Sequence, residues 1–185
     1  MNWNVVLVTS GAVGFGAHRV NMVEKPKNLA TLQALAAVGQ MRLMRMYDDL
    51  FSHFHQPCAQ VLLTYENLDT RSQYMNAKNT LKELLNLGIV PIVNENDTVA
   101  VQELRYGDND TLSALVAGIV DASYLFLLTD VDGLYTSNPR DNPDAKPIHV
   151  VESIRDLKAE IGGSGSSFGT GGMSTKITAA KVKAY

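Results

Sequence analysis

Short apolar runs alternate along this chain with helical stretches, and each run ends in a polar or glycine-containing turn. Apolar residues of strand character occupy 4–9, 60–64, 89–93 and 124–128, and helical patterns occupy 29–54, 71–87 and 110–120. Strands that are apolar on both faces are typical of a parallel sheet buried between helices. Their alternation with helices indicates repeated βαβ units. The sequence therefore predicts an α/β fold with a mostly parallel sheet.

Composition narrows the class of protein further. The chain has 185 residues, 45% of them hydrophobic, which is enough for one domain with a buried core. The net charge of −3 argues against a nucleic-acid or anionic-membrane surface, and no run approaches the roughly 20 apolar residues of a membrane span. Cys58 is the one cysteine, which excludes an internal disulfide and fits a reducing compartment. We expect a cytoplasmic protein without nucleic-acid or membrane partners.

Polar segments follow three of the predicted strands. Ligands of open parallel sheets bind beyond the carboxyl ends of the strands, so these segments are candidate binding loops. Ser10 and Gly11 could form a cradle for an anion, or simply a turn that needs glycine. The Asn-Glu-Asn-Asp run at 94–97 could hold an ammonium or amide-like group, or form a capped turn. Thr129 and Asp130 follow the last strand.

A second acidic segment, Gly-Asp-Asn-Asp at 107–110, leads directly into an apolar helix. Asp110 lies near the first turn of that helix, where one ordinary role is capping. Two acids and an amide exceed what a cap needs. Asp110 could orient lysines that contact a transferring phosphoryl group, or help to bind Mg²⁺, which prefers oxygen ligands.

The glycine-rich segment 169–176, Gly-Thr-Gly-Gly-Met-Ser-Thr-Lys, opens a helix. Backbone N–H groups at a helix N-terminus favour phosphate, and Lys176 adds a cation for developing charge. The order of residues differs from a Walker A motif, in which lysine precedes Ser or Thr. A flexible linker would not lead into an ordered helix. The segment therefore indicates phosphate binding.

Taken together, the motifs resemble those of the amino acid kinase family. The stretches that carry the resemblance run along nearly the whole chain: VTSGAVGFG, AAVGQMRLM, QVLLT, IVPIVNENDTVAV, YGDNDTLSALVA, LFLLTDVDGLYTSNPR and GTGGMSTKITAAK. Within the family they are most similar to the glutamate-phosphorylating branch, and there to its fungal members. The resemblance implies a three-layer αβα sandwich, with residues 1–185 forming one amino acid kinase domain.

The resemblance also implies an activity: ATP-dependent phosphorylation of the γ-carboxylate of L-glutamate, the first step of proline synthesis, with Mg²⁺ accompanying ATP. By motif, Ser10, Asp97 and Asn109 would hold glutamate. Lys176 would stabilise the transferring phosphoryl group, and Asp110 would organise the lysines around it. No side chain is expected as a direct metal ligand. The residues expected to bind ATP are Thr129, Asp130, Gly169, Thr170, Gly171, Gly172, Met173, Ser174 and Thr175.

Regulation and assembly are implied by the resemblance alone. Proline would act as a feedback inhibitor, and the helix expected at 29–54 would serve a homo-oligomer. Family members also carry an upstream strand with a second phosphate-contacting lysine, a final strand and often a PUA domain, and we expect this domain to lack them. We therefore expect the chain to be weakly active or inactive by itself.

Two other functions fit the same motifs. One is a kinase for another small carboxylate, which the loops at 94–97 and 107–110 argue against. The other is a non-catalytic subunit that binds an amino acid or a nucleotide. Calorimetry with glutamate and with ATP–Mg²⁺ would separate binding from turnover.

Overall fold

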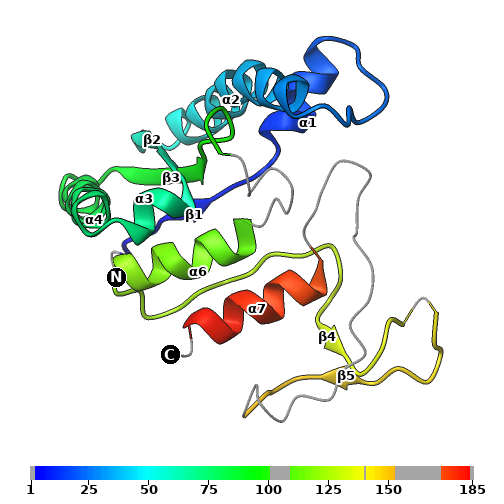
Figure 1. Cartoon of the computed structure of the whole chain (residues 1–185). Helices are drawn as coiled ribbons and strands as arrows, with labels where there is room; N and C mark the ends of the chain where they lie inside the picture. Colours follow the sequence, from blue (N-terminus) through cyan, green and yellow to red (C-terminus); the bar gives the residue numbers. More distant parts are fainter. Residues whose placement is uncertain (1–2, 101–108, 140, 153–171, 184–185) are drawn as a thin grey trace. The chain divides into compact units, whose positions relative to one another are not determined.

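A computed structural model of the chain describes residues 3–100, 109–139, 141–152 and 172–183 (Figure 1). The chain divides into two compact units, Met1–Asn109 and Asp110–Tyr185. Within the described ranges, no helix is both long and apolar enough to cross a bilayer.

The first unit is built on a parallel sheet. Its strands are β1 (Leu7–Val8), β2 (Cys58–Leu63) and β3 (Val90–Glu95), in the order β1-β3-β2. Val93 of the central strand lies opposite Val8 on one side and Val61 on the other. The β-branched, fully buried interior of β3 is what a strand covered on both faces requires. The predicted parallel pairing is confirmed.

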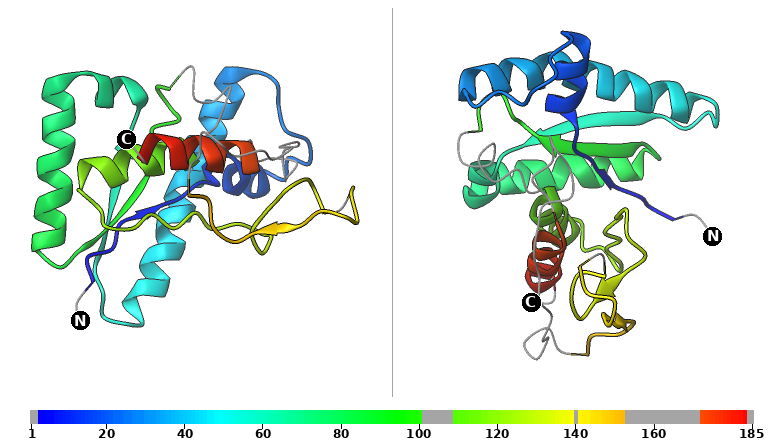
Figure 2. Two further views of the ribbon diagram at one scale, coloured as in Figure 1. Left: turned by 90° about the horizontal axis from the view of Figure 1, so that it is seen from below. Right: turned by 90° about the vertical axis from the view of Figure 1, so that its right-hand side faces the viewer.

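Helices cover both faces of this sheet. α1 (Ala12–Arg19) and α2 (Leu29–Ser52) lie on one face, and α3 (Tyr65–Asp69) and α4 (Arg71–Asn86) lie on the other (Figures 1 and 2). The Asn28 side chain caps α2 by accepting a hydrogen bond from the backbone N–H of Thr31. Gly88 follows α4 with a φ of 71°, the left-handed conformation expected of a glycine after a helix. The layers agree with the predicted αβα arrangement.

α1 and α2 approach each other closely because glycines lie at their contact. A Cβ built on Gly39 of α2 would overlap the backbone carbonyl oxygen of Ala12, and one built on Gly16 would overlap that of Leu35. Backbone atoms cannot move aside as a flexible side chain can. The small residues therefore fix the distance between these helices.

We expect Gly39→Ala to lower the free energy of unfolding by about 3 kcal/mol or more, because the added methyl group forces the two helices apart. Gly14→Ala is the matched control, since a Cβ there meets nothing within 4 Å. It should stabilise the chain by about 0.5–1 kcal/mol through helix propensity. Urea unfolding measures both changes, and equal effects of the two variants would contradict the close contact.

The second unit contains α6 (Asn109–Ile119), whose first residue belongs to the first unit, and α7 (Met173–Lys183). A short antiparallel pair, β4 (Leu134–Tyr135) and β5 (Pro147–Ile148), lies between them in sequence. Leu112, Val116 and Ile119 lie one turn apart along α6 and are buried. This is the spacing expected of an apolar helical face.

The strand predicted at 124–128 is wrong as a paired strand. The segment forms no ladder with any described strand, and Tyr124, Phe126 and Leu128 are 67–83% exposed. A strand needs a neighbour for its N–H and C=O groups. In the described part of this unit, β4 and β5 pair only with each other. The apolar run is present, but the described residues provide no partner strand for it.

Candidate active site

The carboxyl ends of β1 and β3 meet at one edge of the sheet, because the two strands are parallel neighbours. Ser10 lies two residues beyond the end of β1 and is exposed, and Asp97 lies two residues beyond the end of β3. Gly11 is the N-cap of α1 and has a φ of 110°, so the turn interpretation holds for this glycine. Ser10 and Asp97, two of the predicted glutamate ligands, therefore both follow strands whose carboxyl ends lie at this edge.

The predicted loop at 94–97 begins later than expected. Asn94 and Glu95 are strand residues, paired with Leu62 and Leu63 of β2. Both are buried in the sheet, with Asn94 only 1% exposed. The ladder extends because the neighbouring β2 is long enough to continue the pairing. Polar side chains therefore enter the interior of the first unit.

Asn94 joins two elements through its side-chain amide. Its Nδ2 donates to Gln40 Oε1 on α2 at 2.8 Å, and its Oδ1 accepts from Asn109 Nδ2 at 3.1 Å. Asn109 Nδ2 also donates to the backbone carbonyl oxygen of Thr9 at 2.8 Å. These bonds link β1, β3, α2 and the first residue of α6 at the sheet edge.

The Asn109 amide has a fixed orientation. A backbone carbonyl only accepts, so the atom facing Thr9 must be the nitrogen, and both of its N–H groups are used. Asn109 Oδ1 is buried, and no residue in the described ranges donates a hydrogen bond to it. A buried acceptor without a donor costs about 1–3 kcal/mol. The ammonium group of an amino acid is one donor that would satisfy it.

Burial raises the pKa of Asp97 to about 6 from an ordinary value of 3.8. The carboxylate is still largely ionised at pH 7, and it lies in surroundings that disfavour the charge. A cationic ligand would remove that penalty. Asp97 thus has the electrostatics of an ammonium-binding group.

The second unit holds the predicted phosphoryl-transfer pair. Lys176 Nζ lies 3.0 Å from Asp110 Oδ1 and 3.2 Å from Oδ2, and the two side chains are 18% and 17% exposed. The Thr175 hydroxyl lies 2.6 Å from Asp110 Oδ2 and accepts from the backbone N–H of Gly172 at 2.9 Å. The carboxylate therefore fixes the lysine ammonium and the first turn of α7 together.

The remaining predicted nucleotide residues are placed only in part. Gly172 precedes α7, and Met173, Ser174 and Thr175 form its first turn, where backbone N–H groups are available for phosphate. Thr129 and Asp130 are exposed, and the described residues provide no hydrogen bond between them and the Asp110–Lys176 pair. Gly169, Thr170 and Gly171 lie outside the described residues. Their roles stay predictions.

The described residues contain no group of three or more His, Cys, Asp or Glu side chains that could hold a metal ion. Both Asp110 oxygens face the Lys176 ammonium. Asp110 thus contacts a lysine, and its roles toward a phosphoryl group or Mg²⁺ stay predictions.

Several residues of the site were not predicted individually. Asn94 lay within the polar run, but Thr9, Gln40 and Tyr47 carried no separate signal. The hydroxyls of Thr9 and Tyr47 are 2.8 Å apart, so α2 contacts the residue that follows β1. Gln40 and Tyr47 lie on a helix in which polar residues are common, and only the tertiary contacts distinguish them.

Comparison with known proteins assigns the chain to a family. The family model described as the amino acid kinase family matches residues 2–182. The glutamate 5-kinase of Cyanothece sp. is 62% identical over 179 residues, and that of Synechococcus elongatus is 61% identical over 181 residues. These alignments cover 96% and 97% of this chain but 49% of each relative, so the chain spans about half the length of the curated relatives it matches.

These relatives correct one expectation and support another. Both are cyanobacterial, and the predicted similarity to fungal members is not supported. The crystal structure of E. coli aspartokinase III in complex with aspartate and ADP matches with a TM-score of 0.50 and 20% identity, over 74% of this chain and 33% of that one. At this identity the match shows the fold alone, and that fold is the predicted one.

Proposed function

The chain belongs to the amino acid kinase family, and we propose that it carries the amino-acid and phosphoryl-transfer residues of a glutamate 5-kinase. One observation carries the proposal. Asn109, which completes the amide network at the sheet edge, is followed directly by Asp110, which holds Lys176. Two consecutive residues of the sequence thus serve two candidate sites, an ammonium site in the first unit and a phosphoryl site in the second.

L-Glutamate would bind at the edge formed by β1 and β3. Its ammonium group would donate to Asn109 Oδ1, which receives no hydrogen bond within the described ranges, and would neutralise the half-buried Asp97 carboxylate. Ser10 would donate its hydroxyl to a substrate carboxylate. This assignment satisfies the buried acceptor and the half-buried charge with one ligand.

In the proposed reaction, a γ-carboxylate oxygen of glutamate attacks the γ-phosphorus of ATP. A new P–O bond forms, the bond to the β,γ-bridging oxygen breaks, and ADP leaves with its electron pair. No general base is needed, because the γ-carboxylate is already ionised at pH 7. Positioning and charge stabilisation would supply the catalysis, with Mg²⁺ arriving as part of the MgATP substrate.

Within this scheme Lys176 would face the transferring phosphoryl group. Asp110 and Thr175 hold its ammonium and the first turn of α7 in place. A preorganised cation needs no reorganisation as charge develops in the transition state. Gly172 to Thr175 would present backbone N–H groups to the nucleotide phosphates.

An acceptor panel tests the proposal. We expect ADP release with L-glutamate to exceed that with aspartate, N-acetylglutamate or carbamate by about 100-fold in kcat/KM, since each competitor misplaces a carboxylate or lacks the ammonium group. Preference for another acceptor would indicate a different carboxylate kinase. Calorimetric binding of glutamate and MgATP with no turnover would indicate a non-catalytic subunit.

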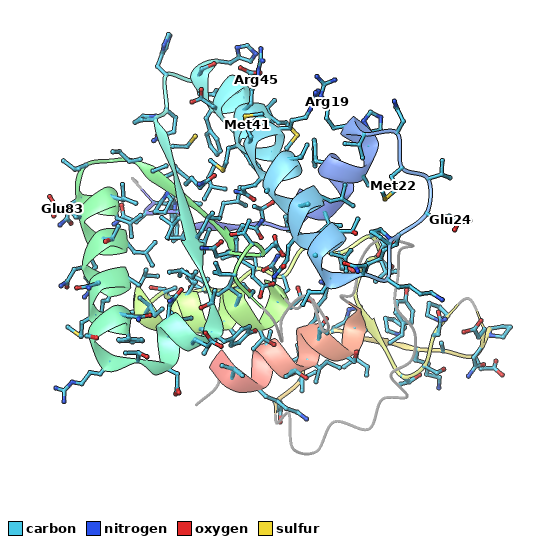
Figure 3. All side chains as sticks on the ribbon, turned by 45° about the horizontal axis from the view of Figure 1, so that its top comes forward. Arg19, Met22, Glu24, Met41, Arg45 and Glu83 are labelled. Atoms are coloured by element: carbon cyan, nitrogen blue, oxygen red, sulfur yellow. The ribbon has the colours of Figure 1, made fainter. Side chains whose placement is uncertain are left out.

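Feedback and assembly complete the proposal. Proline would compete at the glutamate site, and unchanged glutamate affinity at saturating proline would contradict this. A homo-oligomer would use the outward side of α2, where Met41 is 72% exposed and Arg45 also projects outward (Figure 3). Sedimentation of the chain and of its Met41→Lys variant tests that surface.

A further inference from the structure

We propose that Gln40 is a positioning residue that holds the Asn94 amide in place as the second acceptor of Asn109, whose first acceptor is the Thr9 carbonyl oxygen. The proposal rests on the proposed function, because it assigns Asn109 Oδ1 to the glutamate ammonium. In the described residues the hydrogen bonds of Gln40 go to Gln60 and Asn94, and none joins it to Asn109. It would act through Asn94.

Gln40, Asn94 and Asn109 form a relay of side-chain amides that ends at the backbone carbonyl oxygen of Thr9. That oxygen determines which atom of each amide is the donor. Thr9 O only accepts, so the nitrogen of Asn109 faces it and the same nitrogen faces Asn94 Oδ1. Asn94 Nδ2 therefore points away, toward Gln40 Oε1 at 2.8 Å. Each amide in the series can be satisfied in only one orientation.

The hydrogen bond at the outer end of the relay, between Gln40 and Gln60, can be replaced at little cost. Gln40 Nε2 donates to Gln60 Oε1 at 3.1 Å, and Gln60 lies exposed on β2. An exposed amide can rotate at little cost because water replaces its partners. The specific requirement at residue 40 is thus an acceptor atom directed at Asn94.

Loss of that acceptor would act on the buried end. Asn94 is 1% exposed, so its Nδ2 has no water to replace Gln40. Its amide would then no longer be held in the orientation that accepts from Asn109. We expect Gln40→Met, which keeps the length of the side chain but removes the acceptor, to weaken glutamate binding about tenfold.

Two further variants separate positioning from packing. Gln40→Glu keeps an oxygen facing Asn94, and Gln60 can turn its amide to donate to the second oxygen, so glutamate affinity should stay within about threefold of the parent chain. Gln33→Met is the matched control on the same helix. Gln33 donates to the backbone carbonyl of Ala100 and is outside the relay.

The experiment measures glutamate and MgADP affinities by calorimetry on the full chain, together with the side-chain amide NMR signals of Asn94 and Asn109. The proposal predicts a glutamate-specific loss in Gln40→Met, recovery in Gln40→Glu, and shifted Asn109 amide signals in Gln40→Met only. It is overturned if Gln40→Met behaves like Gln33→Met, if MgADP affinity falls equally, or if Gln40→Glu is as damaging as Gln40→Met.

The NMR measurement distinguishes this inference from the proposed function. If the parent chain does not bind glutamate but its Asn109 amide signals respond to Gln40→Met alone, the function fails and the relay stands. If the parent chain binds glutamate and the Asn109 signals do not respond, the function stands and the relay fails.

Discussion

Replacing Lys176 by methionine is expected to lower kcat for glutamate-dependent ADP release by about 1000-fold. The ammonium group is the cation that Asp110 holds at 3.0 Å in the described part of the second unit. Methionine keeps much of the side-chain volume and removes the charge. Because Lys176 would act on the transferring phosphoryl group and not on the amino acid, the glutamate affinity should change by less than about twofold.

The variant also leaves Asp110 without its cation, which lowers stability. The Asp110→Asn/Lys176→Met double variant removes both charges and controls for this effect. Lys181→Met is the matched control, since Lys181 is exposed on the same helix. Equal turnover by Lys176→Met and Lys181→Met, with both variants folded, would contradict the role proposed for Lys176.

Asp97→Asn is expected to raise the glutamate KM by about 100-fold while making the free protein more stable at pH 8. The first effect follows from losing a charged partner of the ammonium group, which contributes about 1.5–3 kcal/mol. The second follows from removing a charge that burial disfavours. One substitution thus separates substrate binding from folding.

The sign of the pH dependence follows from the pKa of Asp97, about 6 in the folded chain against 3.8 ordinarily. Between these values the folded state binds more protons, so the contribution of Asp97 to stability is fully present below pH 3.8 and is lost as the pH rises through 6. The loss amounts to about 3 kcal/mol above pH 7.

Urea unfolding at pH 4 and pH 8 measures the difference. The free energy of unfolding of Asp97→Asn should exceed that of the parent chain at pH 8 and not at pH 4. The exposed Asp69 provides the control substitution Asp69→Asn, which should show no such pH-dependent gain. A stability gain independent of pH, or a loss at pH 8, would show that burial does not disfavour the ionised Asp97 carboxylate in the folded chain.

The sequence predicted the elements whose local signals agree with their packing. α2 and α4 appear within two residues of the predicted ends, and Gly88 after α4 has the left-handed conformation typical of a glycine that ends a helix. The segment 124–128 shows the limit of such patterns. Its residues are apolar throughout, as in a buried strand, but pairing depends on a neighbouring strand that no local pattern identifies.

The candidate site also contains some residues that local signals identify and others that they do not. Residue chemistry and motif order identified Asp110 and Lys176, which lie 66 residues apart and form an ion pair. The amide relay from Gln40 through Asn94 was not predictable. Its members are ordinary polar residues, and their importance arises from burial and from the single orientation that Thr9 O imposes.

The most direct measurement is identification of the product formed from MgATP and L-glutamate in the presence of hydroxylamine. Hydroxylamine converts an acyl phosphate into a stable hydroxamate, so product accumulates even at low turnover. The account predicts γ-glutamyl hydroxamate, abolished by Lys176→Met and reduced by Asp97→Asn at subsaturating glutamate. A hydroxamate at the α-carboxylate, or γ-glutamyl hydroxamate formed as fast by Lys176→Met as by the parent chain, would contradict the account.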